Sequence, residues 1–232
     1  MARKNVDQKP SNGGSNSGGK RSGSPFHLEF KNQAQKMAWG AFDQHDVLFL
    51  LGPAGTGKTH LACAFAIGEV LAKRKKRIIL TRPIVEAGES LGFLPGTFDE
   101  KVNPYMLPMY DCINKCVGVE GPQREIINRS IEVAPIAYMR GRTFDDAICI
   151  FDEAQNATKS QLKLFMTRFG DNSKIIITGD PMQSDIAGGS SSLVQIVKKL
   201  EDLQGIGVIH FKASSIVRHP LIASIIEKFE EE

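Results

Sequence analysis

Short apolar runs recur along the chain and are separated by longer stretches in which apolar positions repeat with a helical period. Four runs are apolar at almost every consecutive position, and a fifth is weaker: residues 47–51, 77–80, 147–151, 174–178 and 207–211. Consecutive apolar residues are typical of strands that are buried on both faces of a parallel sheet. These runs therefore predict five parallel strands.

The stretches between the runs predict helices. Residues 58–73 are rich in Ala, Leu and Ile and end in the basic sequence KRKKR (73–77), which favours a solvated helix C-terminus through the helix dipole. A helix is also predicted over 158–169, because Thr158 and Gln161 match a capping box and the apolar positions that follow share one face. Two further helices are predicted over residues 191–203 and 220–231.

The middle of the chain is less regular. Residues 86–146 contain the sequences PYMLP and GPQ, which interrupt a helical pattern. We predict here an insertion of short helices, with a strand or hairpin near residues 131–138. The alternation of strands and helices around this insertion indicates an α/β fold, a mostly parallel sheet with helices on both faces. One domain over residues 26–232 is expected.

The first 25 residues differ in composition from the rest, being rich in Gly, Ser and Asn, and are expected to form a disordered basic tail. Five basic residues and one acidic residue give the tail a charge of +4, whereas the whole chain carries +3, so the remainder is close to neutral at about −1. A basic tail attracts nucleic-acid phosphates. A short polar terminus is more often only solvated, so charge gives little support for a nucleic-acid partner.

The apolar runs and the cysteines indicate where the protein is located and whether it binds a metal through cysteine. No apolar run approaches the ~20 residues that cross a bilayer, and the N-terminus lacks the apolar core of a signal peptide, so a soluble cytoplasmic protein with no membrane partner is expected. Cys63, Cys149 and Trp39 are expected in the core. Cys112 and Cys116 have no second Cys/His pair at zinc spacing nearby, which argues against a metal site.

The strongest chemical signal is GPAGTGKT, which lies directly after a predicted strand and directly before a predicted helix. This pattern is typical of a phosphate-binding loop, in which glycines allow backbone N–H groups to converge on phosphate oxygens at a helix N-terminus. Lys58 would hold the β- and γ-phosphates of ATP, and Thr59 would bind Mg²⁺. The residues expected to contact the nucleotide are Gly52, Pro53, Ala54, Gly55, Thr56, Gly57, Lys58, Thr59 and His60.

Two adjacent carboxylates follow the third strong strand, in the sequence IFDEAQN. A P-loop enzyme needs a carboxylate at a strand end to hold the Mg²⁺ shell, and Asp152 has that position. Glu153 is then the candidate base for the attacking water. Gln155 is expected to couple the site to its surroundings. An alternative, in which both acids only cap the next helix, becomes weaker once the P-loop is accepted.

A third element, TGDPMQ, follows the next strand and places Asp180 and Gln183 at the carboxyl edge of the sheet, where open α/β sheets bind ligands. Gln183 is predicted to contact the γ-phosphate or the attacking water. The motifs GPAGTGKT, TRP, FDEAQ and GDPMQ, in this order, resemble the core of superfamily one helicases and, more closely, the PhoH-like family of P-loop ATPases. Longer stretches such as IEVAPIAYMRGRTFDDA and SSIVRHPLIASI carry the PhoH-like resemblance.

This resemblance implies a RecA-like domain in which the GDPMQ strand lies between the P-loop strand and the FDEAQ strand. It implies that Gln35 reads the adenine edge, although Gln33 is an alternative, and that Arg82 in LTRP contacts nucleic acid. The chain also resembles the short family members that bacteriophages carry.

Helicases of this kind complete their ATP site with an arginine from a second domain, for which too few residues follow GDPMQ. An arginine that stabilises charge on the γ-phosphate accelerates turnover by roughly 10³-fold or more. We therefore expect this arginine from a neighbouring subunit of a homo-oligomeric ring, for which we predict a hexamer. Arg218 and Arg142 are the leading candidates, ahead of Arg140, and Arg82 is a further candidate that could instead contact nucleic acid.

The sequence thus predicts a Mg²⁺-dependent ATPase, with ATP hydrolysis coupled to single-stranded nucleic acid, RNA rather than DNA, in a helicase-like ring. Two alternatives remain open. The chain could remodel protein partners or act as a nucleotide switch without nucleic acid, or it could be a P-loop kinase, against which Glu153 and Gln183 argue.

Overall fold

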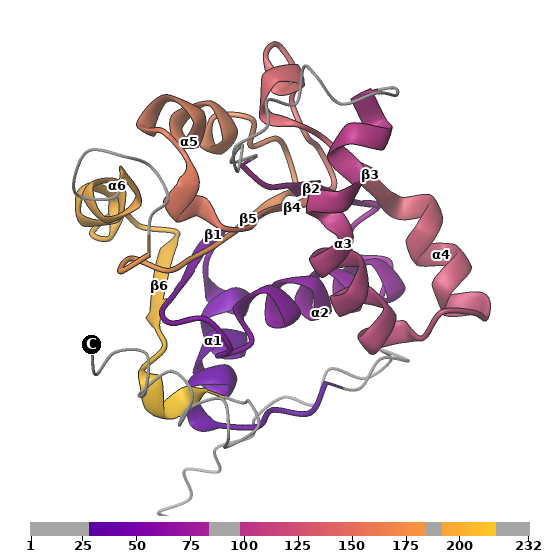
Figure 1. The fold of residues 1–232 in the computed structure, drawn as a ribbon, viewed down its shortest axis with the longest axis horizontal. Helices are drawn as coiled ribbons and strands as arrows, with labels where there is room; N and C mark the ends of the chain where they lie inside the picture. The colour runs from indigo at the N-terminus through magenta and orange to yellow at the C-terminus, as the bar shows by residue number, and fades with distance from the viewer. Residues whose placement is uncertain (1–27, 84–97, 184–191, 217–232) are drawn as a thin grey trace, which may run out of the picture.

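The computed structural model describes residues 28–83, 98–183 and 192–216 (Figure 1). A six-stranded sheet forms its centre, in the order β3-β2-β4-β5-β1-β6, and all strand pairs are parallel. The strands are β1 (Val47–Leu51), β2 (Arg77–Thr81), β3 (Ile131–Val133), β4 (Ala147–Phe151), β5 (Lys174–Gly179) and β6 (Ile206–His210). The helices are α1 (Gln33–Gln44), α2 (Lys58–Leu71), α3 (Phe98–Val117), α4 (Pro122–Ser130), α5 (Lys159–Met166) and α6 (Ser192–Leu200). Short 3₁₀ turns cover Ile136–Met139, Ala154–Asn156 and Ala213–Ser215.

Helices cover both faces of the sheet, as Figure 1 shows, with α1 to α4 on one face and α5 and α6 on the other. Successive residues of a strand point to opposite faces. Leu48 and Leu50 of β1 accordingly pack toward the first helical layer, and Phe49 and Leu51 pack toward the second. Burial on both faces explains the continuous apolar runs in the sequence.

The predicted strands are confirmed, with ends that differ by at most one residue from those expected. The order of the sheet also confirms the RecA-like arrangement, because β5 pairs with both β1 and β4. The segment near residues 131–138 forms one strand, β3, which pairs parallel to β2. A hairpin would require antiparallel pairing, so that alternative does not form.

The prediction of short helices in the middle segment is wrong for α3, a helix of 20 residues that contains Pro104 and Pro108. A proline inside a helix removes one backbone donor and normally breaks the helix. Here the buried side chains of Met106, Met109 and Ile113 pack into the core beside α2. Tertiary packing therefore offsets the lost hydrogen bonds.

Local helix signals were accurate for α5 and less so for α2. Thr158 caps α5 with Gln161 in a capping box, as predicted. The KRKKR cluster is not a simple solvated helix end, because α2 stops at Leu71 and Lys75 is buried. The Lys75 ammonium donates to the backbone and side-chain oxygens of Asn172 at 2.6 and 2.7 Å and so ties the turn before β2 to the turn before β5.

Several other predictions concern the core and the ends of the chain. Cys63 and Cys149 are buried, which confirms them as core residues. Trp39 is partly buried and packs against the core, with its ring centroid 5.1 Å from that of Phe65. The predicted helix at 191–203 is α6, in slightly shorter form. The N-terminal tail and the helix expected at 220–231 lie outside the described residues. Among the described helices, none is long and apolar enough to span a bilayer.

Candidate nucleotide-binding site

The phosphate-binding loop connects the carboxyl end of β1 to the amino end of α2. Gly52 has φ 146°, and a Cβ atom there would overlap the backbone oxygen of Phe211, so only glycine fits. Gly55 and Gly57 have φ values of 84° and 87°, in the left-handed region that glycine adopts without strain. The three glycines of the motif are thus explained by the backbone path of the loop.

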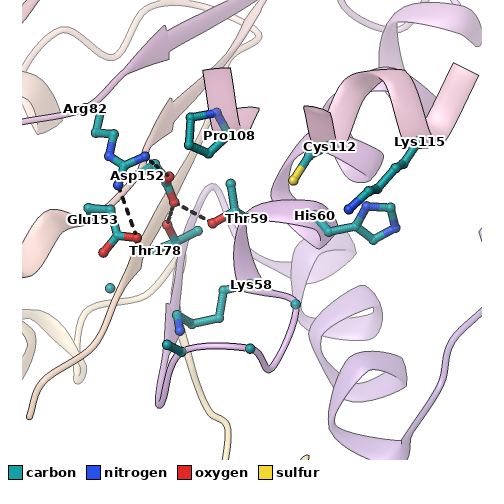
Figure 2. A pocket seen from close by; sticks show the side chains of 14 residues that line it. Lys58, Thr59, His60, Arg82, Pro108, Cys112, Lys115, Asp152, Glu153 and Thr178 are labelled. Carbon is teal, nitrogen blue, oxygen red and sulfur yellow. Dashed lines mark hydrogen bonds and ion pairs between the residues drawn. The ribbon is translucent and has the colours of Figure 1, made fainter. Parts of the chain in front are cut away.

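The side chain of Lys58 lies within the loop (Figure 2). Its ammonium donates to the backbone oxygens of Gly52 at 2.6 Å and Pro53 at 2.9 Å, and the Thr56 hydroxyl donates to the same Pro53 oxygen at 2.9 Å. A phosphate oxygen bound in the loop would compete with these carbonyls for the ammonium, because a charged acceptor makes the stronger hydrogen bond.

Asp152, which follows β4, forms hydrogen bonds with residues of α2 and β5 next to the loop. The side chain is 2% exposed, and its Oδ1 accepts hydrogen bonds from the Thr59 hydroxyl at 2.7 Å and the Thr178 hydroxyl at 2.5 Å. Thr59 lies in the first turn of α2, Asp152 follows β4, and Thr178 lies near the end of β5. The strand order therefore places the two predicted Mg²⁺ ligands, Thr59 and Asp152, side by side.

The chemistry of these donors fits Mg²⁺. The ion prefers hard oxygen ligands and keeps several waters and phosphate oxygens around one or two protein ligands. A hydroxyl and a carboxylate lie together here, and no group of three or more His, Cys, Asp or Glu side chains gathers as a closed metal cage within the described residues. Such a partial set suits an ion that is shared with a nucleotide.

Glu153 adopts an unusual backbone conformation next to Asp152. Its φ of 53° and ψ of 43° are in the left-handed region, which is strained for a residue with a Cβ atom. Its carboxylate accepts a hydrogen bond from Gln155 Nε2 at 2.5 Å, and Gln155 Oε1 accepts one from the backbone N–H of Asp180 at 3.0 Å. Gln155 thus links the acid pair to the end of β5 by hydrogen bonds, and its role in coupling the site to its surroundings stays a prediction.

Arg82 faces both acids from the end of β2. Its guanidinium nitrogens lie 3.9 Å from Asp152 Oδ2 and 3.6 Å from Glu153 Oε1, and one of them donates to the backbone oxygen of Tyr105 in α3 at 3.4 Å. The sequence indicated Arg82 as a candidate for the γ-phosphate or for nucleic acid, and not as a partner of the two acids. The available signal was its place directly after β2, which is the neighbour of β4 in the sheet.

A cavity of about 550 Å³ lies over the loop (Figure 2). Lys58, Asp152 and Glu153 form one side of it, and Cys112 and Lys115 form part of the other side. A smaller cavity of about 240 Å³ adjoins the loop and is also lined by Cys112 and Lys115. The contribution of α3 was missed, because the sequence predicted an irregular insertion there.

Gln35 lines the smaller cavity, together with His60 and Lys31. Its Nε2 donates to the Thr56 backbone oxygen at 3.3 Å, and its Oε1 accepts from the Lys31 N–H at 2.8 Å. Gln35 is buried whereas Gln33 is exposed, so Gln35 is the one beside the loop. Contact with adenine stays a prediction.

The remaining site candidates lie away from the loop or outside the described residues. Gln183 is exposed and does not line the large cavity. Arg142 precedes β4, at its amino end, where its guanidinium lies 2.5 Å from Glu132 Oε1 and over the Phe144 ring. Arg140 is exposed, and Arg218 falls outside the described residues. A role for any of these arginines in a neighbouring subunit stays a prediction.

The sequence of the chain is similar to those of known proteins from one family. A family model described as PhoH-like protein matches residues 27–230. The PhoH-like protein of Bacillus subtilis is 47% identical over 206 residues, which are 88% of this chain and 65% of that protein. The PhoH-like protein of Mycobacterium tuberculosis is 46% identical over 200 residues, with 86% and 57% covered. Protein PhoH of Escherichia coli is 40% identical over 195 residues, with 82% and 55% covered.

The chain spans between 55% and 65% of the length of these three relatives. Among solved structures, the large terminase from a thermophilic bacteriophage superposes with a TM-score of 0.56 at 11% sequence identity, covering 88% of this chain and 50% of the terminase. At that identity the likeness concerns the fold alone, which is the α/β fold of P-loop NTPases.

Proposed function

The chain belongs to the PhoH-like protein family, and from this membership and the geometry of the loop we propose that it binds ATP with Mg²⁺ and hydrolyses the ATP. One observation carries the proposal. Thr59 and Thr178 both donate to Asp152 Oδ1, so that a phosphate-binding loop, a metal-binding carboxylate and the adjacent Glu153 meet at the carboxyl edge of the sheet. This is the set of groups that ATP hydrolysis requires.

The loop and α2 would bind the nucleotide. Backbone N–H groups between Gly52 and Thr59 would donate to the phosphates, and the amino end of α2 would add the favourable end of its dipole. Lys58 would neutralise the β- and γ-phosphates. Thr59 and Asp152 would hold Mg²⁺, which would supply positive charge to offset the charge that develops on the phosphates. The adenine base of ATP would occupy the smaller cavity beside Gln35.

We assign to Glu153 the role of general base in hydrolysis. The hydrogen bond from Gln155 and the strained backbone orient its carboxylate at the cavity wall, where it would accept a proton from a water that attacks the γ-phosphate. Arg82 contacts the other oxygen of the same carboxylate and limits its rotation. A carboxylate base at this position supports water as the acceptor and disfavours a kinase, whose acceptor is a second substrate.

Coupling to single-stranded nucleic acid and assembly into a ring are further parts of the proposal. Arg82 is the one arginine among the described residues that lines the large cavity, and it is engaged with the two acids. We assign a second arginine for the γ-phosphate to a neighbouring copy, an arrangement that a ring would provide. Nucleic acid, RNA rather than DNA, would act on turnover through β2 and β5, whose ends carry Arg82 and Asp180.

The test is ATP hydrolysis by the wild-type chain and by Glu153→Gln, with and without single-stranded RNA and DNA, at a protein concentration where the mass of the assembly has been measured. We expect Glu153→Gln to bind ATP but to lose at least about 100-fold in turnover. Glu125→Gln on α4, where the carboxylate is 71% exposed, is the matched control and should keep wild-type turnover. Full turnover by Glu153→Gln would contradict the assignment, and no stimulation by either nucleic acid would contradict the coupling.

A further inference from the structure

Three of the four cysteines lie where α2 packs against α3, beside the cavity over the loop. Cys63 is on α2 and fully buried, whereas Cys112 and Cys116 are on α3 and partly exposed. The Cys116 sulfur lies 3.8 Å from His60 Nδ1. Figure 2 shows Cys112 and His60 next to one another, across the cavity from the two acids. Of these three cysteines, Cys112 is the one that lines both cavities.

The surroundings of Cys112 favour its thiolate. Hydrogen bonds from the Cys63 thiol and from the His60 ring lower the pKa of Cys112 to about 5, although burial opposes this change. Cys63 keeps its proton, because the hydrogen bond to Cys112 and its burial raise its pKa. Burial, and then the charge of Cys112, raise the pKa of Cys116 to about 12.

Several other charged groups face the same space. They are Lys115 on α3, Lys58 in the loop, Arg82 and Asp152 at the strand ends, and Glu29 and Lys31 across the smaller cavity. The three basic groups nearest the loop and α3 add a positive field, which also favours a thiolate. Asp152 acts in the opposite direction and raises the pKa of Cys112.

We propose that Cys112 is a redox modification site, a nucleophilic thiol that forms a mixed disulfide with a low-molecular-weight disulfide and thereby closes the nucleotide cavity. Its position carries the proposal, because its sulfur is reachable from a cavity whereas the sulfur of Cys63 is buried behind it. The proposal rests on the assignment of that cavity to ATP.

The reaction balances without a further oxidant. The Cys112 thiolate attacks one sulfur of the small disulfide, and a new sulfur–sulfur bond forms as the old bond breaks. The electron pair of the broken bond leaves with the other half of the reagent as a thiolate, which takes a proton from water. A second thiolate, from an external thiol, reverses the step and restores Cys112.

The consequence follows from the place of the sulfur. A group attached to Cys112 would project into the large cavity toward the phosphate-binding loop, or into the smaller cavity beside Gln35. Either position overlaps the volume that ATP would need. The thiol state of Cys112 would then control nucleotide binding, and bound ATP would in turn shield Cys112.

The first part of the test needs no assumption about ATP. The full chain is treated with hydroxyethyl disulfide, which is small and uncharged, and the modified cysteine is located by mass spectrometry of peptides. Cys112 is expected to react at least about 10-fold faster than Cys116, its neighbour one helical turn away. Cys116→Ser, the matched control, should keep this fast reaction, and Cys112→Ser should lose it. Fast modification of Cys116 or Cys149 in place of Cys112 would overturn the proposal.

The second part measures the affinity of untreated, treated and thiol-restored protein for a fluorescent ATP analogue. We expect treatment to weaken binding at least about 10-fold in the wild type, a thiol reductant to restore it, and Cys112→Ser to show the same affinity before and after treatment. Unchanged affinity of fully modified protein would overturn the inference. Failure of the untreated protein to bind the analogue would instead overturn the proposed function, so the two outcomes are distinguishable.

Discussion

The hydroxyl of Thr59 donates a hydrogen bond to the carboxylate of Asp152, with Oγ1 and Oδ1 2.7 Å apart although 93 positions separate the two residues in the chain. Thr59 lies at the start of α2 and Asp152 at the end of β4, so the contact exists only because the sheet brings these ends together. Both oxygens suit Mg²⁺. The contact therefore marks the place where we propose that Mg²⁺ binds.

Thr178→Val tests the second hydrogen bond to Asp152. The substitution keeps the shape but removes the donor that lies 2.5 Å from Oδ1 of a buried carboxylate. We expect Mg²⁺-dependent turnover to fall about 10- to 100-fold, because partners of a metal ligand orient it, and the free energy of unfolding to fall by about 1–3 kcal/mol. Turnover at varied Mg²⁺ and urea unfolding provide the measurements.

Thr81→Val is the matched control, since the Thr81 hydroxyl is buried at the end of β2 without a hydrogen-bond partner in the described part of the chain. Replacing an unsatisfied hydroxyl by a methyl group should leave the free energy of unfolding unchanged or raise it slightly. Equal losses in the two variants would show that the Thr178 contact has no special role.

Gln155→Leu should slow hydrolysis by acting through Glu153. The variant loses the donor to the Glu153 carboxylate and the acceptor for the Asp180 N–H. We expect kcat to fall roughly 10- to 100-fold with little change in KM, because the base loses its orientation while the loop is untouched. In the Glu153→Gln background the same substitution should add almost nothing. Additive losses would mean that Gln155 acts independently of Glu153.

Two glycine substitutions should have opposite effects. Gly52→Ala places a Cβ atom against the Phe211 backbone oxygen at a φ of 146°, so it should lower the free energy of unfolding by about 3 kcal/mol or more and abolish nucleotide binding. Gly40→Ala lies within α1, where the new methyl group would meet no described atom within 4 Å. It should raise the free energy of unfolding by about 0.5–1 kcal/mol. Thermal unfolding of both variants provides the comparison.

Alkylation of Cys112 by iodoacetamide should depend little on pH between 6 and 8. An ordinary thiol, with a pKa of about 8.5, gains close to 10-fold in rate per pH unit over this range, because its thiolate fraction rises. The lowered pKa of Cys112 keeps it ionised throughout, so its rate should change by less than about 2-fold. A rise of 10-fold per unit, measured by peptide mass spectrometry, would contradict a stabilised thiolate.

Mixing of inactive subunits separates arginines that act in the same chain from those that act on a neighbour. Lys58→Ala subunits combined with Arg142→Ala or Arg218→Ala subunits should regain turnover, if the second arginine completes the neighbour's site. The control is Arg82→Ala, because Arg82 contacts the acids of its own chain, and its mixture with Lys58→Ala should regain none. Intact assembly of every mixture is checked by mass, and recovery in the control alone would reverse the assignment.

The features that follow local rules were predictable from the sequence. The strands, the loop glycines and the Thr158 cap each depend on neighbouring residues, and all were placed correctly. The family resemblance also supplied the position of β5 in the sheet. These signals were enough to bring Lys58 and the two acids to one edge.

What could not be predicted depends on contacts between distant elements. The prolines of α3 indicated a break, but packing beside α2 keeps the helix intact and delivers Cys112 and Lys115 to the cavity. The sequence around Lys75 indicated a solvated cation, whereas the fold gives this ammonium Asn172 as its partner. Arg82 could be assigned to the acids only once β2 was known to lie beside β4.

The position of β5 between β1 and β4 has a consequence during synthesis on the ribosome. A nascent chain that ends near residue 160 already contains the P-loop and both acids, yet β1 and β4 have no direct pairing and are joined in the sheet through β5. The chain must emerge beyond Gly179 before Thr59 and Asp152 can settle side by side. Unfinished chains would therefore lack the proposed ATP site, which would form only when the centre of the sheet is complete.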